Sequence, residues 1–242
     1  MDRVKRARNE RDSSSGKRIM KNPPATRASK KGATRDAILR AALHLIVTRG
    51  YHRTSTSQIA RAAGVAEGTL YVHFKSKEQL ALEIFKLCSE SMSASMIEAV
   101  QEAHSTAERI RIMIARAFDW CEKHREEAIY AFLLRHSEIF PRHLTHMDVP
   151  GNPALLLQEV ILQAQQAGEV DQQELNALEK VAGIPLAFIR ERLEDGATGD
   201  LRDKVDIVTK MCCGALGISQ QTMHPVYRTD RAVRAELEPI RR

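Results

Sequence analysis

Apolar residues recur at helical spacing along nearly the whole chain from Thr34 onward, and no segment alternates in the way typical of a β-strand. The first helix is predicted to begin near Ala33 and to end at Gly50, because glycine is favoured just past a helix end. Its buried stripe consists of Ile38, Leu39, Ala42, Leu45 and Ile46. This periodicity predicts an all-α fold.

Two short helices follow, and a capping box precedes the first of them. Residues 55–58 have the sequence Ser-Thr-Ser-Gln, in which Ser55 and Gln58 can each accept a hydrogen bond from the other's backbone amide. That helix ends at Gly64, and a very short helix then covers residues 66–73. A second capping box at residues 76–79 starts the next helix. Because helices of one or two turns are marginal alone, we expect a compact three-helix unit that presents its third helix.

Longer helices are expected beyond residue 93, with breaks at prolines and glycines. They are predicted at residues 105–123, 125–140, 153–167, 171–194 and 201–219. The chain thus divides into an arm at residues 1–32, a head at 33–80, a larger helical domain at 81–220 and a polar tail at 221–242.

The positive charge of the chain is concentrated in the arm. The chain has 242 residues and a net charge of +6. The arm contains eleven basic and three acidic residues, a net charge of +8, so the other 210 residues carry −2. A basic arm that is disordered until it binds is typical of proteins with an anionic partner such as nucleic acid or a membrane surface. A solubilising tail is an equally good interpretation.

The sequence also argues against several classes of protein. No apolar stretch approaches the ~18 residues of a membrane helix, so we expect a soluble, cytoplasmic protein that makes no contact with a membrane. Four cysteines are too few for a disulfide framework, and the adjacent Cys212 and Cys213 resemble buried apolar residues. Cys121 and His124, together with His143, His146 and Asp148, have no spacing characteristic of a metal site. No phosphate loop, nucleophile elbow or paired carboxylates occur, so we expect no catalytic residue, no metal and no cofactor.

The segment of residues 50–80 combines the apolar spacing, the two caps, the Gly64 turn and the string Tyr-Val-His-Phe-Lys-Ser-Lys. This segment is similar to the DNA-binding domain of the TetR (tetracycline-repressor) family of transcriptional regulators, and the resemblance covers about residues 34–85. It implies a helix-turn-helix head and a larger effector-binding and dimerisation domain. It further implies a homodimer on a palindromic DNA operator, most often a repressor that a small molecule releases.

The resemblance assigns DNA contacts to matching positions of the head. These positions are Thr56, Gly68, Thr69, Tyr71, His73 and Lys77. Leu70 and Phe74 are expected to face inward and to anchor the third helix. Lys75 lies just beyond that helix and could reach phosphate. For Tyr71 and His73 the alternative is a packed aromatic cluster.

Two residues depart from the family pattern at the start of the third helix. Ala66 replaces the serine that often caps this helix, and Glu67 stands where many relatives have lysine. The Glu67 carboxylate interacts favourably with the positive N-terminal end of the helix dipole. It repels DNA phosphate, unless it accepts a hydrogen bond from a cytosine amino group. Ahead of the first helix, the basic arm residues Arg27, Lys30 and Lys31 could enter the minor groove.

The larger domain is expected to supply the dimer surface and the effector cavity. Segments 174–194 and 201–219 resemble the paired C-terminal helices of a family dimer, and an intramolecular core is the alternative. A Met and aromatic stripe supplies candidate effector contacts, although such a stripe is more often core. The candidates are Met113, Phe118, Trp120, Cys121, His124, Tyr130, Phe132, Arg135, His136 and Phe140. A helical ligand-binding or scaffolding protein that no longer reads DNA is the alternative function.

Overall fold

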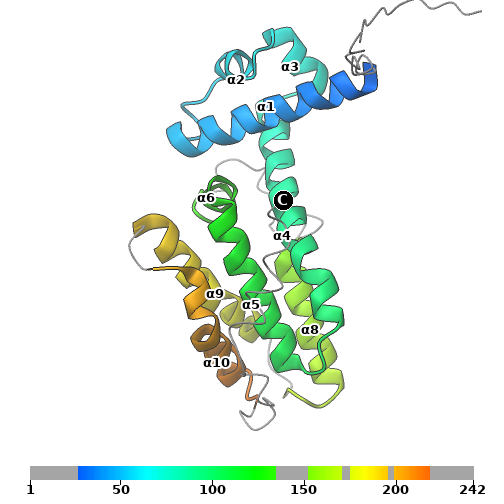
Figure 1. Cartoon of the computed structure of the whole chain (residues 1–242), viewed down its shortest axis with the longest axis vertical. Helices are drawn as coiled ribbons and strands as arrows, with labels where there is room; N and C mark the ends of the chain where they lie inside the picture. The colour runs from blue at the N-terminus through cyan, green and yellow to red at the C-terminus, as the bar shows by residue number, and fades with distance from the viewer. Residues whose placement is uncertain (1–26, 135–151, 171–174, 196–198, 219–242) are drawn as a thin grey trace, which may run out of the picture.

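The computed structural model describes residues 27–134, 152–170, 175–195 and 199–218, and in these ranges all regular secondary structure is helical. Helix α1, which begins at Arg27, runs across the view below α2 and α3, and α4 extends down from it into the rest of the chain (Figure 1). The helices are α1 (Arg27–Arg49), α2 (Thr56–Ala62), α3 (Glu67–His73), α4 (Lys77–Gln101), α5 (Thr106–Lys123), α6 (Arg125–Phe132), α8 (Pro153–Gln166), α9 (Leu175–Asp195), the 3-10 helix η2 (Leu201–Lys204) and α10 (Val205–Ala215).

The head consists of α1, α2, α3 and the first turns of α4. The predicted stripe of α1 is buried, and Gly50 ends the helix with a φ of +88°. However, α1 begins at Arg27 rather than near Ala33, so the last six residues of the predicted arm are helical. The two basic residues Lys30 and Lys31 therefore lie on the first turns of a helix.

The α2–α3 turn has the form predicted from its caps and its glycine. The Ser55 hydroxyl accepts from the Gln58 amide and the Gln58 side chain accepts from the Ser55 amide, which confirms the capping box. Gly64 adopts a φ of +70°, and the Val65 amide donates to the Ala60 carbonyl at 3.0 Å. A left-handed residue followed by this bond is the Schellman end of a helix, and it fixes the direction in which α3 leaves α2.

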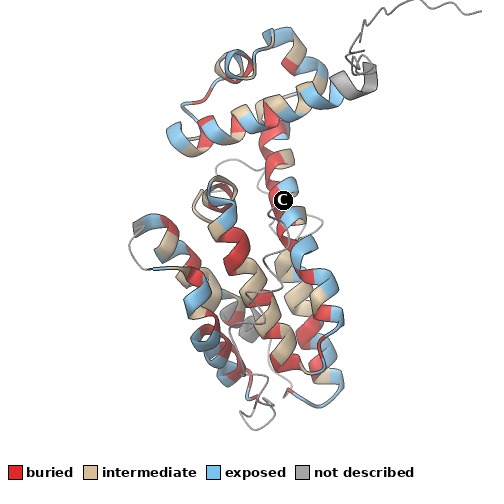
Figure 2. Cartoon of the chain, viewed as in Figure 1, coloured by how far each residue is buried: buried red, intermediate tan, exposed pale blue. Residues whose placement is uncertain are grey.

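Helix α4 joins the head to the body, which comprises the remaining helices. Ser76 caps α4 as predicted, but the Gln79 side chain accepts from the Lys75 amide at 2.6 Å instead of closing the second capping box. The helix is 25 residues long and unbroken, so the predicted boundary between residues 80 and 81 falls inside it. Buried residues continue along α4 from the head into the body (Figure 2).

The body packs around α5, which contacts α4, α8 and α10. Helices α5 and α8 match the predicted segments closely. Helix α6 ends at Phe132, whereas the prediction extended to residue 140, and residues 135–140 lie outside the described ranges. The predicted helix at 201–219 is divided into η2 and α10 because Asp200 caps a separate first turn through the Arg202 amide at 2.9 Å.

A carboxylate of α5 holds the end of α9 in place. Glu122 accepts two hydrogen bonds from the Arg192 guanidinium, at 2.9 and 3.1 Å, and a third from the Leu201 amide at 3.0 Å. A bidentate pair of this kind restrains both direction and distance. It therefore fixes α9 and the start of η2 against α5.

All four cysteines are buried free thiols, so Cys212 and Cys213 occupy the apolar environment that was predicted for them. Across the described part of the chain, no helix combines the length and the apolarity needed to span a membrane.

Candidate nucleic-acid interface and cavity

The outer face of α3 is open to solvent, and its inner face is anchored in the head. Leu70 and Phe74 are buried, as the sequence predicted. Glu67, Gly68 and Tyr71 are exposed. Thr69 and His73, which lie on one flank of the helix, are half-buried. The half-buried His73 ring lies 6.3 Å from the Phe74 ring between centroids, so these two rings pack together, while Tyr71 faces outward.

Three of the predicted DNA-contacting residues meet where α2 and α3 begin. The Thr56 hydroxyl donates to the Glu67 carboxylate at 2.8 Å and lies 3.2 Å from the Tyr71 hydroxyl. Ala66 caps α3 without any side-chain hydrogen bond, as expected from alanine. Glu67 is therefore held by a hydroxyl beside it, and one of its oxygens is already occupied.

Lys77 is bound within the head rather than extended towards solvent. Its ammonium donates to the carbonyls of Tyr51 and Thr54, at 3.2 and 3.1 Å, and lies 4.1 Å from the centroid of the Tyr51 ring. Burial, followed by the nearby Glu78 carboxylate, raises the pKa of Tyr51 to about 12. Lys77 thus positions the loop between α1 and α2, while Lys75 is exposed.

The head carries other exposed basic residues. Lys31 is exposed on α1, whereas the side chains of Arg27 and Lys30 lie outside the described residues. The sequence reasoning passed over three exposed side chains of the motif, His52, Arg53 and Arg61. The only sequence feature that pointed to these three residues was their position within residues 50–80, the segment that resembles a DNA-binding domain.

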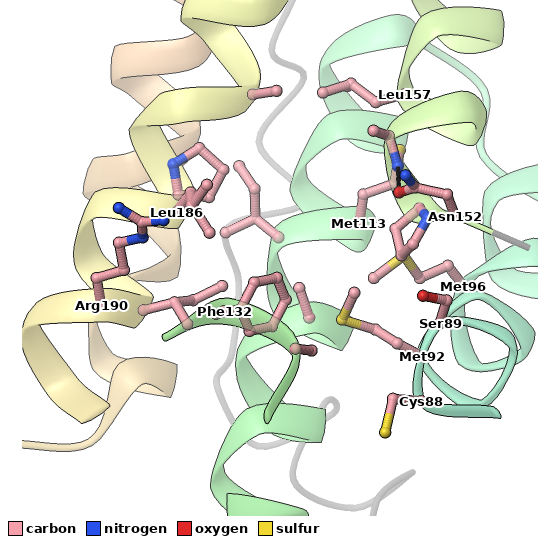
Figure 3. Close-up of a pocket in the computed structure, with 18 of the residues that line it drawn as sticks. Cys88, Ser89, Met92, Met96, Met113, Phe132, Asn152, Leu157, Leu186 and Arg190 are labelled. Atoms are coloured by element: carbon pink, nitrogen blue, oxygen red, sulfur yellow. Dashed lines mark hydrogen bonds between the residues drawn. The ribbon is translucent and has the colours of Figure 1, made fainter. Parts of the chain in front are cut away.

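The body contains a cavity of about 380 Å³ that is open to solvent on one side and is lined by residues of α4, α5, α6, α8, α9 and α10. Its walls are mostly apolar and include Met92, Met96, Met113, Phe132 and Leu186 (Figure 3). Pockets of this size and polarity are typical of small-molecule sites.

Few polar groups line this cavity. The Ser89 side chain, 5% exposed, lies on the α4 wall. Asn152 caps α8 through the Ala154 amide at 2.9 Å. On the opposite wall, Arg190 of α9 is exposed (Figure 3), and no described acidic residue pairs with it. The cavity thus combines an apolar interior with a cation at its edge.

Of the seven predicted effector contacts that lie in the described ranges, Met113 and Phe132 line this cavity, whereas His124 is exposed and does not. Four others, Phe118, Trp120, Cys121 and Tyr130, are core residues that do not line it. Trp120 donates to the Ser91 hydroxyl at 3.1 Å and stacks on His124, while Tyr130 donates to the Ala81 carbonyl at 2.8 Å. Arg135, His136 and Phe140 lie outside the described residues.

Sequence reasoning missed the α4 and α9 walls. On α4 the available signal was a pair of methionines four residues apart, Met92 and Met96, which share one helical face. On α9 it was Pro185, a proline inside a helix that lines the cavity.

The predicted dimer segments divide into a buried and an exposed face. Val205, Val208, Cys212 and Leu216 pack within this chain, so for these residues the intramolecular alternative is correct. Ile207 and Met211 are 55% and 46% exposed on the other side of α10. Ala215, which lies in the predicted dimer segment 201–219, is also exposed.

Comparison with known proteins gives consistent matches for the head and for the fold. The sequence family described as "Bacterial regulatory proteins, tetR family" matches residues 38–84. The "Fatty acid metabolism regulator protein" of Bacillus subtilis (strain 168) is 31% identical over 134 residues, which cover 55% of this chain and 69% of that protein.

Two solved structures share the fold. The transcriptional regulator FadR from Bacillus subtilis in complex with stearoyl-CoA has a TM-score of 0.65 at 22% identity, covering 74% of this chain and 98% of that one. AibR in complex with isovaleryl coenzyme A and operator DNA has a TM-score of 0.58 at 22% identity, covering 77% and 100%.

Proposed function

This chain belongs to the TetR family of bacterial regulatory proteins, and we propose that an acyl-coenzyme A bound in its cavity releases it from DNA. The chain is a DNA-binding transcriptional regulator that responds to a small molecule, and DNA binding favours the cytoplasm as its location. The observation that carries the acyl-CoA proposal is the apolar cavity with Arg190 exposed at its edge.

The chemistry of the cavity fits a ligand with an apolar chain and an anionic head. Methionine side chains such as Met92 and Met96 are flexible, so they adapt to acyl chains of different shape. An arginine pairs well with phosphate, because its planar guanidinium donates two parallel hydrogen bonds. The relatives support this assignment: one is a fatty acid metabolism regulator, and two solved structures hold acyl-CoA ligands.

Two helices connect the cavity with the head. Helix α4 lines the cavity with Phe85 and contributes Leu80 to the core of the head. Helix α6 contributes Phe132 to the cavity, and at its other end Glu126 lies 2.7 Å from His44 of α1. A ligand that displaces either helix therefore shifts the head, and its binding and DNA binding become coupled.

On DNA, we expect the outer face of α3 to enter the major groove, with Lys75 and Lys31 near phosphates. Two heads must lie about 34 Å apart to read both halves of a palindrome. The exposed face of α10, which carries Ile207 and Met211, is our candidate for the contact between two copies.

The test starts from a duplex selected out of a randomised pool by the full-length protein, hereafter the selected duplex. Stearoyl-CoA and isovaleryl-CoA are then titrated into the complex, with coenzyme A and stearate as controls. We expect at least one acyl-CoA to release the DNA with its thioester intact, because a regulator binds this ligand without cleaving it. Release by coenzyme A alone, or by no acyl-CoA, would contradict the proposal.

A pair of variants tests the role of Arg190. Arg190→Ala is expected to weaken acyl-CoA binding about tenfold in calorimetry, because one charge-assisted contact is lost. Arg40→Ala removes the same charge from an exposed position on α1 and should leave acyl-CoA affinity unchanged. Equal effects of the two variants would show that only net charge matters.

A further inference from the structure

The outermost residue of α3 is apolar. Successive helical residues are rotated by about 100°, so Gly68 and Val72 lie nearest to the line opposite Leu70. Leu70 is fully buried, and Val72 is 72% exposed, more than any other large apolar side chain in the described ranges. Burial in the head therefore cannot explain why valine occupies this position.

The space beside Val72 is left open by Gly68, one turn earlier. A Cβ atom placed on Gly68 would meet no atom of the protein within 4 Å, and the residue does not adopt a positive φ. Glycine inside a helix costs about 1 kcal/mol relative to alanine. Nothing within the described chain requires this glycine, so its small size matters for a partner that approaches the outer face closely.

The polar groups of α3 lie to either side of this line. Glu67 and Tyr71 lie on one flank, where both contact Thr56, and Thr69 and His73 lie on the other flank. Val72 has no hydrogen-bonding group. Among the base edges in the major groove, the one strongly apolar feature is the C5-methyl group of thymine.

We propose that the Val72 methyl groups pack against a thymine C5-methyl in each half of the DNA site, with Gly68 giving the bases the room to approach. The proposal rests on the DNA-binding function and names the base that the centre of α3 reads. It makes Val72 a specificity-determining residue alongside the polar residues predicted from the sequence.

Replacement of thymine by deoxyuridine tests this contact, because it removes only the methyl group. Each thymine of the selected duplex is replaced in turn, symmetrically in both halves, and Kd is measured by fluorescence anisotropy. We expect one symmetric pair of positions at which uracil weakens the unaltered protein about fourfold per methyl contact, the effect of about one buried carbon group.

Val72→Ala is then measured on the same duplexes. It should bind the thymine duplex more weakly and lose the distinction between thymine and uracil at that pair. Val72→Thr keeps the β-branched shape but exchanges a methyl for a hydroxyl, and it should also reduce the distinction. Ile97→Ala, at an exposed apolar position of α4, should change neither value.

The outcomes separate this inference from the regulatory function. If no duplex is enriched, DNA reading itself is refuted, and the inference with it. If a duplex is enriched but Val72→Ala retains the full preference for thymine over uracil, only the role of Val72 is refuted. Because the Val72 side chain is exposed, its replacement should not disturb the fold. Circular dichroism checks that the variants are folded, so that a loss of DNA binding can be assigned to the lost contact.

Discussion

The Thr56 hydroxyl donates a hydrogen bond to the Glu67 carboxylate across the α2–α3 turn, with 2.8 Å between Oγ1 and Oε1. Both residues belong to the surface that we expect to face DNA. The contact holds a negative charge beside the predicted phosphate contacts and engages the Thr56 hydroxyl as a donor. It therefore favours a repulsive role for Glu67 over contact with one particular base.

The first prediction concerns this charge. Glu67→Gln should bind the selected duplex and a scrambled duplex more tightly by similar factors, about fivefold, because one repulsion of about 1 kcal/mol is removed. Anisotropy titrations of both duplexes at one salt concentration measure the effect. Glu98→Gln, on an exposed part of α4, should change neither affinity. A loss of affinity that depends on a single cytosine would show instead that Glu67 reads a base.

A second prediction separates the two lysines near the start of α4. Lys77→Ala should lower the melting temperature and weaken binding to every duplex, because the loop at Tyr51 and Thr54 loses its anchor. Lys75→Ala should leave the melting temperature unchanged and reduce the slope of log K against log salt by about 1, as loss of a phosphate contact does. Calorimetric melting and salt titrations measure both quantities. If the two variants behave alike, the roles that we assign to them are wrong.

The third prediction follows from the open space at Gly68. Gly68→Ala should stabilise the fold, by up to about 1 kcal/mol in urea unfolding, and should weaken binding to the selected duplex. Gly183→Ala, in α9, also places its Cβ in open space and should stabilise the fold without loss of DNA affinity. Unchanged DNA binding by Gly68→Ala would show that no partner comes close to this residue.

The fourth prediction concerns the buried thiols. Burial raises the pKa of Cys88, Cys121 and Cys212 from 9.0 to about 12. Because the folded state holds these protons more tightly, the stabilisation is complete below pH 9 and is lost as pH rises from 9 towards 12. Urea unfolding at pH 8, 9 and 10 should show this decline, and Cys212→Ala should make it shallower.

Thiol reactivity provides the control for that prediction. At neutral pH the protonated, buried thiols should react slowly with Ellman's reagent, and all four should react rapidly in urea. Bound acyl-CoA should slow the reaction of Cys88 and Cys212 further, since both line the cavity. Equal rates for the native and unfolded chains would be incompatible with the burial described here.

Local features were predictable from the sequence because short-range contacts determine them. The Ser55 capping box, the Gly64 turn and the inward positions of Leu70 and Phe74 all follow from spacing within a few residues. The second capping box was predicted only in part, because Gln79 has two amides within reach and bonds to that of Lys75.

Features that depend on distant segments were less predictable. The aromatic stripe of α5 was assigned to the effector, but Trp120 turns towards α4 and donates to Ser91. Lys77 was expected at a phosphate, and the fold instead places it under carbonyls more than twenty residues earlier in the chain. The α9 wall of the cavity was missed because only tertiary packing brings it opposite Met113.

The unbroken length of α4 has a mechanical consequence. Leu80 and Met92 are separated by twelve residues, a lever arm of about 18 Å at the rise of an α-helix. A rotation of α4 by about 3° about Met92 therefore moves Leu80 by about 1 Å. We therefore expect branching or an added methylene in the proposed acyl ligand, a change too small to unfold the protein, to alter the alignment of the two heads of a dimer.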